Sequence, residues 1–232
     1  METDSGQPTL AAMMETLRSV SDESWGRYAF SREMLRERIP AGEIPELIAG
    51  SLRCGEEYAC RVMRETGRST ARDIAERLGV TVEPDTRPAG GARRILFARF
   101  TPPRTIDIMR EPLARYAQLL PTLPPAESAA LPDADGVYDM LLGHELFHYA
   151  EESHASEIYT RRRTIRLWKI FGFENRTTIR ALSEIAAMAF ARTLCRVGYS
   201  PFALDVLLFY SYDKSNARRI YDHIMERCTG PV

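Results

Sequence analysis

Apolar residues recur every three or four positions along most of the chain, and this spacing is typical of one face of an α-helix. The pattern covers residues 9–63, with an interruption at residues 39–42 that contains Pro and Gly. It returns over residues 71–78, where Ser69-Thr70 stands at the start and Gly79 at the end. Because Ser and Thr cap helix starts and Gly suits the residue after a helix, the sequence predicts helices over these ranges.

Two short segments depart from this spacing. Residues 95–100 and 105–109 are rich in β-branched and aromatic side chains and are separated by Pro102-Pro103-Arg104. Such runs predict two strands, and their separation suits a hairpin. Residues 80–82 are also expected to be extended, and residues 84–91 are expected to form a loop.

The second half of the chain is again mostly helical in pattern, and Asp135 is placed to cap one of its helices. Residues 121–135, which contain several prolines, are expected to form a loop, and residues 157–173 are expected to be irregular or extended. The sequence thus predicts an α+β fold that is mostly helical, with a small β-sheet before residue 110. The helices expected in this half are residues 111–120, 135–152, 178–197, 201–210 and 215–228.

The composition is that of an ordinary folded protein, and it excludes several classes. The 232 residues carry 31 Lys and Arg against 32 Asp and Glu, a formal net charge of −1. This balance disfavours a dedicated nucleic-acid binder, which is usually basic. There is no run of 18 apolar residues and no secretory signal at the start, so neither a membrane span nor a membrane partner is expected. The four cysteines form no CxxC pair, which favours a reduced, cytoplasmic protein.

The candidate chemistry lies in the string His144-Glu145-Leu146-Phe147-His148, an HExxH motif. Side chains four residues apart lie on the same face of a helix, so two imidazoles can share one metal ion. Glu145 is rotated about 100° from His144 and is expected to face the metal-bound water. Its predicted role is general base, followed by proton donation to the leaving group. The motif therefore predicts a zinc centre with Glu145 as its catalytic residue.

A catalytic zinc centre takes a third protein ligand, and two residues compete for this position. His154 follows His148 at the metzincin spacing, but Glu151 occupies the position where that pattern has the glycine that turns the chain. Glu184 lies in one of the most apolar helical segments of the chain, and a carboxylate there must reach the surface or meet a cation. Glu184 is therefore the preferred third ligand.

Three segments of the chain resemble the ImmA/IrrE family of HExxH zinc metallopeptidases. Residues 71–82 resemble its opening helix and strand, residues 141–149 its metal helix, and residues 184–191 its ExxANxFA segment. The resemblance implies a zincin-like fold over residues 67–232, after an N-terminal helical segment over residues 1–66. It also implies Zn²⁺ on His144, His148 and Glu184, and an endopeptidase activity on a protein or peptide substrate.

The sequence departs from the family at two positions, and alternatives follow. Met188 stands where the family usually has Asn, and Phe147 stands where many members have Gly. The gap from His148 to Glu184 is long for the family, so Glu157 and Glu174 also remain candidates for the third ligand. The alternative function is a catalytically weak zincin-like regulator that binds a protein partner.

Peptide hydrolysis also needs a group that stabilises the oxyanion. The sequence offers four candidates without choosing among them: Tyr149, His154, Tyr159 and Arg180. A basic run, Arg161-Arg162-Arg163 with Arg166 and Lys169, is expected to be a solvated face. The alternative for this run is docking of an acidic segment or of nucleic acid.

Overall fold

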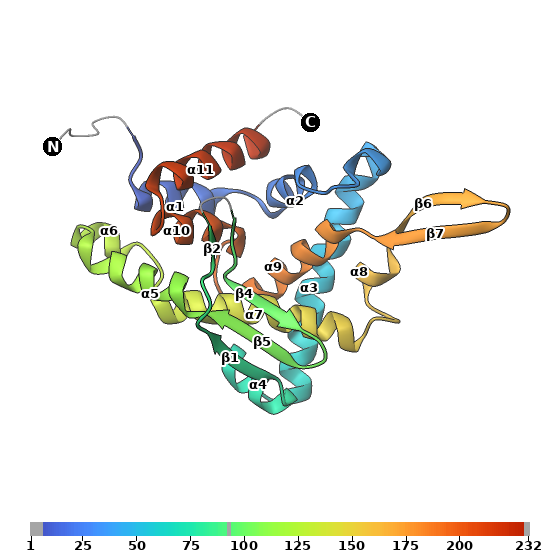
Figure 1. Ribbon diagram of the computed structural model, residues 1–232, viewed down its shortest axis with the longest axis horizontal. Coiled ribbons are helices and arrows are strands. Elements are labelled where there is room, and N and C mark those ends of the chain that lie inside the picture. Colours follow the sequence, from blue (N-terminus) through green and yellow to red (C-terminus); the bar gives the residue numbers. More distant parts are fainter. Residues whose placement is uncertain (1–6, 92–93, 230–232) are drawn as a thin grey trace.

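Helices account for most of the computed structural model, which describes residues 7–91 and 94–229 (Figure 1). The predicted class, α+β and mostly helical, is confirmed. Residues 1–6 of the predicted N-terminal segment lie outside the described residues. The α-helices are α1 (Leu10–Ser19), α2 (Asp22–Ser31), α3 (Ile44–Thr66), α4 (Ala71–Leu78), α5 (Arg110–Leu119), α6 (Pro125–Ala129), α7 (Ala134–Ser153), α8 (Tyr159–Arg162), α9 (Arg180–Cys195), α10 (Leu204–Tyr210) and α11 (Lys214–Thr229).

The predicted helix boundaries of the first third follow local chemistry. The Thr70 side chain accepts a hydrogen bond from the Asp73 amide at 3.2 Å and starts α4. Gly67 and Gly79 both adopt φ +66°, a left-handed conformation that L-residues disfavour, and they end α3 and α4. The interruption predicted at residues 39–42 is wider in the structure, because α2 ends at Ser31 and two 3-10 turns, Arg36–Arg38 and Ala41–Glu43, precede α3. A further break, which the pattern did not predict, separates α1 from α2.

A three-stranded sheet precedes the HExxH helix, as predicted, and its strand order is β1 (Thr81–Asp85), β5 (Thr105–Met109), β4 (Ala98–Thr101). β4 and β5 form the expected antiparallel hairpin, whereas β1 joins β5 in parallel. β4 is therefore an edge strand, and it lies against α7. A separate two-stranded pair forms between β2 (Gly90–Gly91) and β3 (Arg94–Ile95), within and just after the predicted loop.

The core is built around three long helices, with α9 packed between α3 and α7. Two glycines allow these close approaches. A Cβ on Gly55 would lie 2.1 Å from the Ala186 carbonyl oxygen of α9, and one on Gly143 would lie 3.3 Å from Ala191. Helix α3 belongs to the predicted segment 1–66 and α9 to the predicted domain 67–232, yet their buried residues share one continuous core.

Several local predictions are corrected by the structure. Asp133, not Asp135, caps α7, because its side chain accepts a hydrogen bond from the Gly136 amide at 2.7 Å. Asp135 instead pairs with Arg72 at 2.7 Å. The predicted loop 121–135 contains α6, whose start is set by consecutive prolines. Helix α9 ends at a left-handed Arg196, earlier than the glycine that the pattern favoured.

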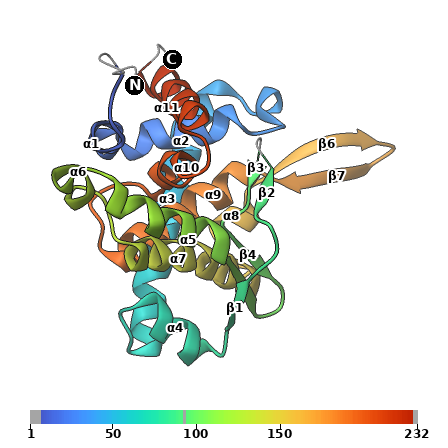
Figure 2. The same ribbon diagram turned by 60° about the vertical axis from the view of Figure 1, so that its left-hand side comes forward.

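The largest unexpected feature is a second antiparallel hairpin, which lies in the sequence between α7 and α9, the two helices of the predicted metal site. The predicted irregular stretch 157–173 forms α8 and then β6 (Thr164–Ile170), which pairs with β7 (Phe173–Thr178). This hairpin projects from the body of the molecule in both views (Figures 1 and 2). No helix in the described ranges is long and apolar enough to cross a membrane.

Candidate metal centre

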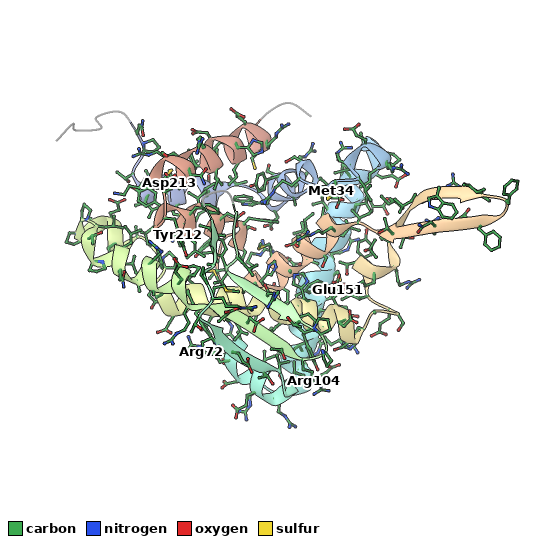
Figure 3. The ribbon with its side chains drawn as sticks, viewed as in Figure 1. Met34, Arg72, Arg104, Glu151, Tyr212 and Asp213 are labelled. Carbon is green, nitrogen blue, oxygen red and sulfur yellow. The ribbon has the colours of Figure 1, made fainter. Side chains whose placement is uncertain are left out.

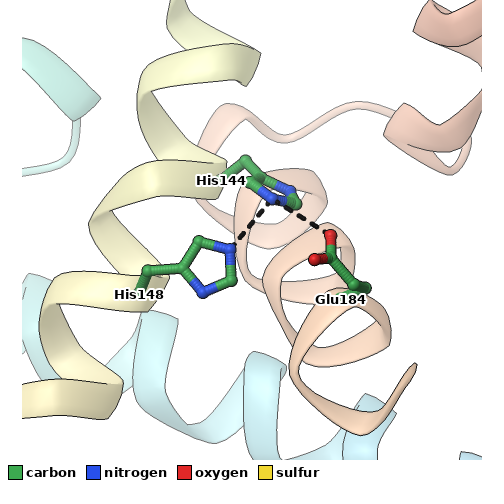
Figure 4. A group of neighbouring side chains, drawn as sticks. All are labelled: His144, His148 and Glu184. Carbon is green, nitrogen blue, oxygen red and sulfur yellow. Dashed lines mark hydrogen bonds and ion pairs between the residues drawn. The ribbon is translucent and has the colours of Figure 1, made fainter. Parts of the chain in front are cut away.

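Helix α7 brings the two histidines of the motif onto one face. Their Nε2 atoms lie 3.1 Å apart (Figure 4). Two imidazole nitrogens bound at about 2.0–2.1 Å to one tetrahedral ion are separated by roughly 3.3 Å. The spacing of His144 and His148 therefore suits joint binding of a single ion.

Glu184 reaches the same point from α9. Its Oε2 lies 3.6 Å from His144 Nε2, and one ligand atom from each of the three residues lies within 4.8 Å of the others. The close contact of Gly143 with Ala191 lets α7 and α9 approach near this site. The cluster His144, His148 and Glu184 can hold a metal ion, and these are the three ligands that the sequence preferred.

His148 is held from behind by a network that the sequence analysis did not find. Its Nδ1 lies 3.3 Å from Ser183 Oγ, and the Ser183 hydroxyl donates to Glu151 Oε2 at 3.0 Å. Thr160 donates to the other carboxylate oxygen of Glu151 at 2.5 Å, and Arg161 Nε lies 3.4 Å from that carboxylate. When Nε2 faces a metal, Nδ1 carries the proton and donates, so this network fixes the ring orientation.

The signal for this network was present in the sequence but ambiguous. Glu151 is 4% exposed. A buried carboxylate needs partners, and here they come from Thr160 of α8 and from Ser183 of α9, which is 32 residues away. The sequence analysis considered Glu151 only as the residue that replaces the metzincin glycine. Arg161, expected to lie on a solvated face, is half-exposed and contacts Glu151 and Glu152.

The electrostatics of the cluster favour a bound cation. Burial lowers the pKa of His144, and the neighbouring His148 lowers it further. Burial also opposes the charged form of His148, but the carboxylates of Glu151, Glu145 and Glu184 outweigh it and raise the pKa of this imidazole. Burial acts against the charged form of Glu184, but the two histidines and Arg180 outweigh it and lower its pKa. A neutral imidazole and an ionised carboxylate are the forms that bind metal.

Glu145 is 7% exposed and points toward the sheet. Its Oε2 accepts a hydrogen bond from the Phe100 amide of β4 at 2.7 Å. An edge strand has one row of amide and carbonyl groups without a strand partner, and the Glu145 carboxylate accepts the hydrogen bond of one of these amides. The predicted general base therefore stands between the two histidines and the free edge of β4.

A cavity of about 360 Å³ opens beside the cluster. His144, Glu145 and Glu184 form one wall. A second polar group, which the sequence did not predict, lines this cavity: Arg32 Nη1 lies 3.3 Å from the Tyr28 hydroxyl and 3.3 Å from Asp205 Oδ2. The rest of the lining is mostly apolar, including Phe97, Ala98, Met188, Leu204 and Phe209.

The competing third ligands lie elsewhere. His154 Nδ1 contacts the Ala150 carbonyl at 2.9 Å, and its ring packs on Tyr58. Glu157 pairs with Arg61 at 2.9 Å. Glu174 lies on the projecting hairpin among three cations. None of the three joins the cluster.

The four candidates for oxyanion stabilisation do not line the cavity. The Tyr149 ring packs edge-on against Phe100. Tyr159 packs on Gly50 of α3, and Arg180 Nε lies 3.5 Å from Glu184 Oε1. The role therefore stays unassigned among Tyr149, His154, Tyr159 and Arg180.

Comparisons with protein-family models, with curated proteins and with solved structures each gave no match.

Proposed function

We propose that this protein is a zinc-dependent metallopeptidase that resembles the ImmA/IrrE family and hydrolyses a peptide bond with Glu145 as general base. The observation that carries the proposal is the convergence of His144, His148 and Glu184, with Glu145 buried beside them. The set of two histidines and one carboxylate is a known donor set of catalytic zinc, and three protein ligands leave one position open. Zn²⁺ is therefore the proposed cofactor.

The residues present fit such an ion. His144 and His148 each direct Nε2 to the shared point, and Glu184 supplies a carboxylate oxygen. Zn²⁺ bound there would supply Lewis acidity, which lowers the pKa of a water and polarises a carbonyl. The Ser183 and Glu151 network would hold the His148 ring during turnover.

Glu145 would handle the protons. The Phe100 amide fixes Oε2, which leaves Oε1 to accept a proton from the attacking water. The same carboxylic acid would then donate the proton to the leaving amine, so that Glu145 ends the cycle ionised.

The edge of β4 would align the substrate. Phe100 directs its amide to Glu145 rather than to β5, and Ala98, two residues earlier, directs its backbone groups to the same edge. An extended peptide could pair with this edge at Ala98, where Glu145 does not take the backbone amide, and such strand addition is a recurring mode of peptide recognition. The cavity would then receive one of its side chains, and its lining favours an apolar one. The proposed substrate is accordingly a protein or peptide in extended form.

A second candidate is a zincin-like regulator that keeps the metal but does not hydrolyse peptides. The bond between Glu145 and Phe100 favours it, because it ties the predicted base to the sheet. Four free cysteines agree with a reducing, cytoplasmic location for either function.

The variant Glu145→Gln distinguishes the peptidase from the regulator. Wild-type and variant protein, each loaded with zinc, are incubated with peptides from an unfolded protein, and cleavage is followed by mass spectrometry. The proposal predicts cleavage by the wild type only, with one equivalent of zinc in both. If the zinc-loaded wild type cleaves no more than the variant, the peptidase assignment is wrong and the regulator is favoured.

A further inference from the structure

The hairpin β6–β7 carries apolar side chains that the rest of the molecule does not cover. It leaves the body after α8, turns at Phe171-Gly172 with φ of 48° and 89°, and returns to α9. Of its apolar residues, only Ile165 packs against the core. Both views show the outer half free of contact with other elements (Figures 1 and 2).

The strand register sorts the hairpin into two faces. Paired residues share a face, and successive residues alternate between faces. The pairs Ile170–Phe173 and Trp168–Asn175 lie on one face, which is apolar toward the tip. The pairs Lys169–Glu174 and Arg166–Arg176 lie on the other, which is charged. A register shift between Arg166 and Trp168 keeps this separation along the strand.

Exposure rises toward the tip. The exposed fractions are 47% for Trp168, 56% for Ile170, 76% for Phe173 and 99% for Phe171. Figure 3 shows the side chains at the far end of the hairpin pointing away from the molecule. Large apolar side chains are rarely this exposed in a group, and such groups mark interaction sites.

A collar of positive charge lies behind the tip. The hairpin, residues 164–178, carries three cationic side chains, Arg166, Lys169 and Arg176, and one anionic one, Glu174. This single carboxylate is shared by Lys169 at 3.3 Å, Arg176 at 3.4 Å and Arg166 at 3.6 Å. The hairpin therefore keeps a net positive charge, because one carboxylate faces three cations.

We propose that this hairpin is an arm that docks the protein onto an anionic lipid surface. At about 3.3 Å per residue counted along β7, the Lys169–Glu174 pair lies roughly 7 Å behind the tip and the Arg166–Arg176 pair roughly 13 Å behind it. Apolar groups of interfacial elements enter a bilayer by about 5–10 Å. The tip residues would thus lie among the acyl chains while the cations reach the phosphate headgroups.

Charge complementarity decides between the possible occupants. A second copy of this chain would bring two positively charged hairpins together. An apolar pocket on another protein would use the tip but would leave the collar without a role. An anionic bilayer uses both in the order in which the hairpin presents them. The sequence predicted no membrane partner because it has no apolar run long enough to span a bilayer. The proposed contact does not need such a run, because it involves only the surface of the membrane.

The test uses full-length zinc-loaded protein and vesicles of phosphatidylcholine with and without phosphatidylglycerol. Binding is measured by flotation and by Trp fluorescence. The chain has two tryptophans, and Trp25 is 1% exposed, so a blue shift would come from Trp168. The account predicts binding only with phosphatidylglycerol, with weakening at high salt. The double variant Phe171→Ser/Phe173→Ser should lower binding about tenfold or more, because it removes apolar area from the tip.

Met34→Ser is the matched control, since Met34 is 94% exposed but lies outside the hairpin. It should bind vesicles as the wild type does. Unchanged zinc content and unfolding temperature show that the tip variant is folded, as expected for residues outside the core. Absence of binding, equal binding to uncharged vesicles, or a tip variant that binds normally would each overturn the proposal. A dimer in solution that the tip variant abolishes would identify a second copy as the occupant instead.

Discussion

Glu151→Gln is the substitution that tests most sharply how the site is organised. Glu151 does not touch the proposed ion, but its Oε2 accepts from Ser183, which contacts His148 Nδ1. Glutamine keeps the size of the side chain, so the change removes charge and one acceptor without leaving a cavity. Its amide nitrogen is a donor only, and one of the two hydroxyls, on Thr160 or Ser183, loses its acceptor.

The expected loss follows from this geometry. Outer partners of histidine ligands are typically worth a factor of about 10–100 in metal affinity. Glu151 is 4% exposed, so solvent cannot replace the missing acceptor. We therefore expect zinc affinity to fall by about 10–100-fold, which corresponds to roughly 1.4–2.8 kcal/mol. Competition with a chromophoric chelator measures the affinity directly.

Glu152→Gln is the matched control. Glu152 is the next residue on α7, is exposed, and pairs with the same Arg161 at 3.1 Å, but it makes no contact with His148. It should bind zinc as the wild type does. If Glu151→Gln also binds zinc normally while both variants stay folded, the network does not position His148 and this part of the account is wrong.

Three other predictions follow from the packing, the thiols and the metal. Gly55→Ala should lower the unfolding temperature, because its Cβ would lie 2.1 Å from a backbone oxygen of α9 and overpacking costs about 1–3 kcal/mol. Gly42→Ala is the control, since no atom lies within 4 Å of its Cβ, and equal unfolding temperatures of the two variants in calorimetry would contradict this prediction. Burial raises the pKa of Cys54 to about 11, so little of its thiol is ionised at pH 8, and iodoacetamide should modify the exposed Cys60 much faster than Cys54. Peptide mass spectrometry measures both rates, and faster modification of Cys54 would show that α3 opens readily. Removal of metal by a chelator should increase hydrogen exchange in α7 and α9 more than in α1, since the ligands join only the first two; unchanged exchange would weaken Glu184 as a ligand.

The fold was predictable from sequence where local chemistry decides it. Thr70 and Gly79 set the two ends of α4, and the β-branched and aromatic residues just before residue 110 predicted the β4–β5 hairpin. Prediction failed where distant contacts decide. The parallel pairing of β1 with β5 depends on tertiary contacts. In the β6–β7 hairpin a register shift between Arg166 and Trp168 interrupts the alternation of apolar and charged residues, so the pattern did not predict a strand.

The same distinction holds for the site. His144, Glu145 and His148 were predictable because one helix fixes their relative positions. Glu184 could be inferred because a carboxylate among apolar residues needs a cation. Ser183 and Arg32 could not be found, since short polar and cationic residues carry no pattern, and only the packing of α9 and α2 brings them to the site.

The central claim is that His144, His148 and Glu184 form one metal site, and zinc content tests it most directly. Protein purified in metal-free buffer is titrated with zinc, and bound metal is measured by mass spectrometry for the wild type and for single alanine variants. The account predicts one equivalent in the wild type and in His154→Ala, and strongly reduced affinity in Glu184→Ala, because Glu184 meets the histidines and His154 does not. Retention of tight zinc binding by Glu184→Ala together with its loss in His154→Ala would contradict the assignment.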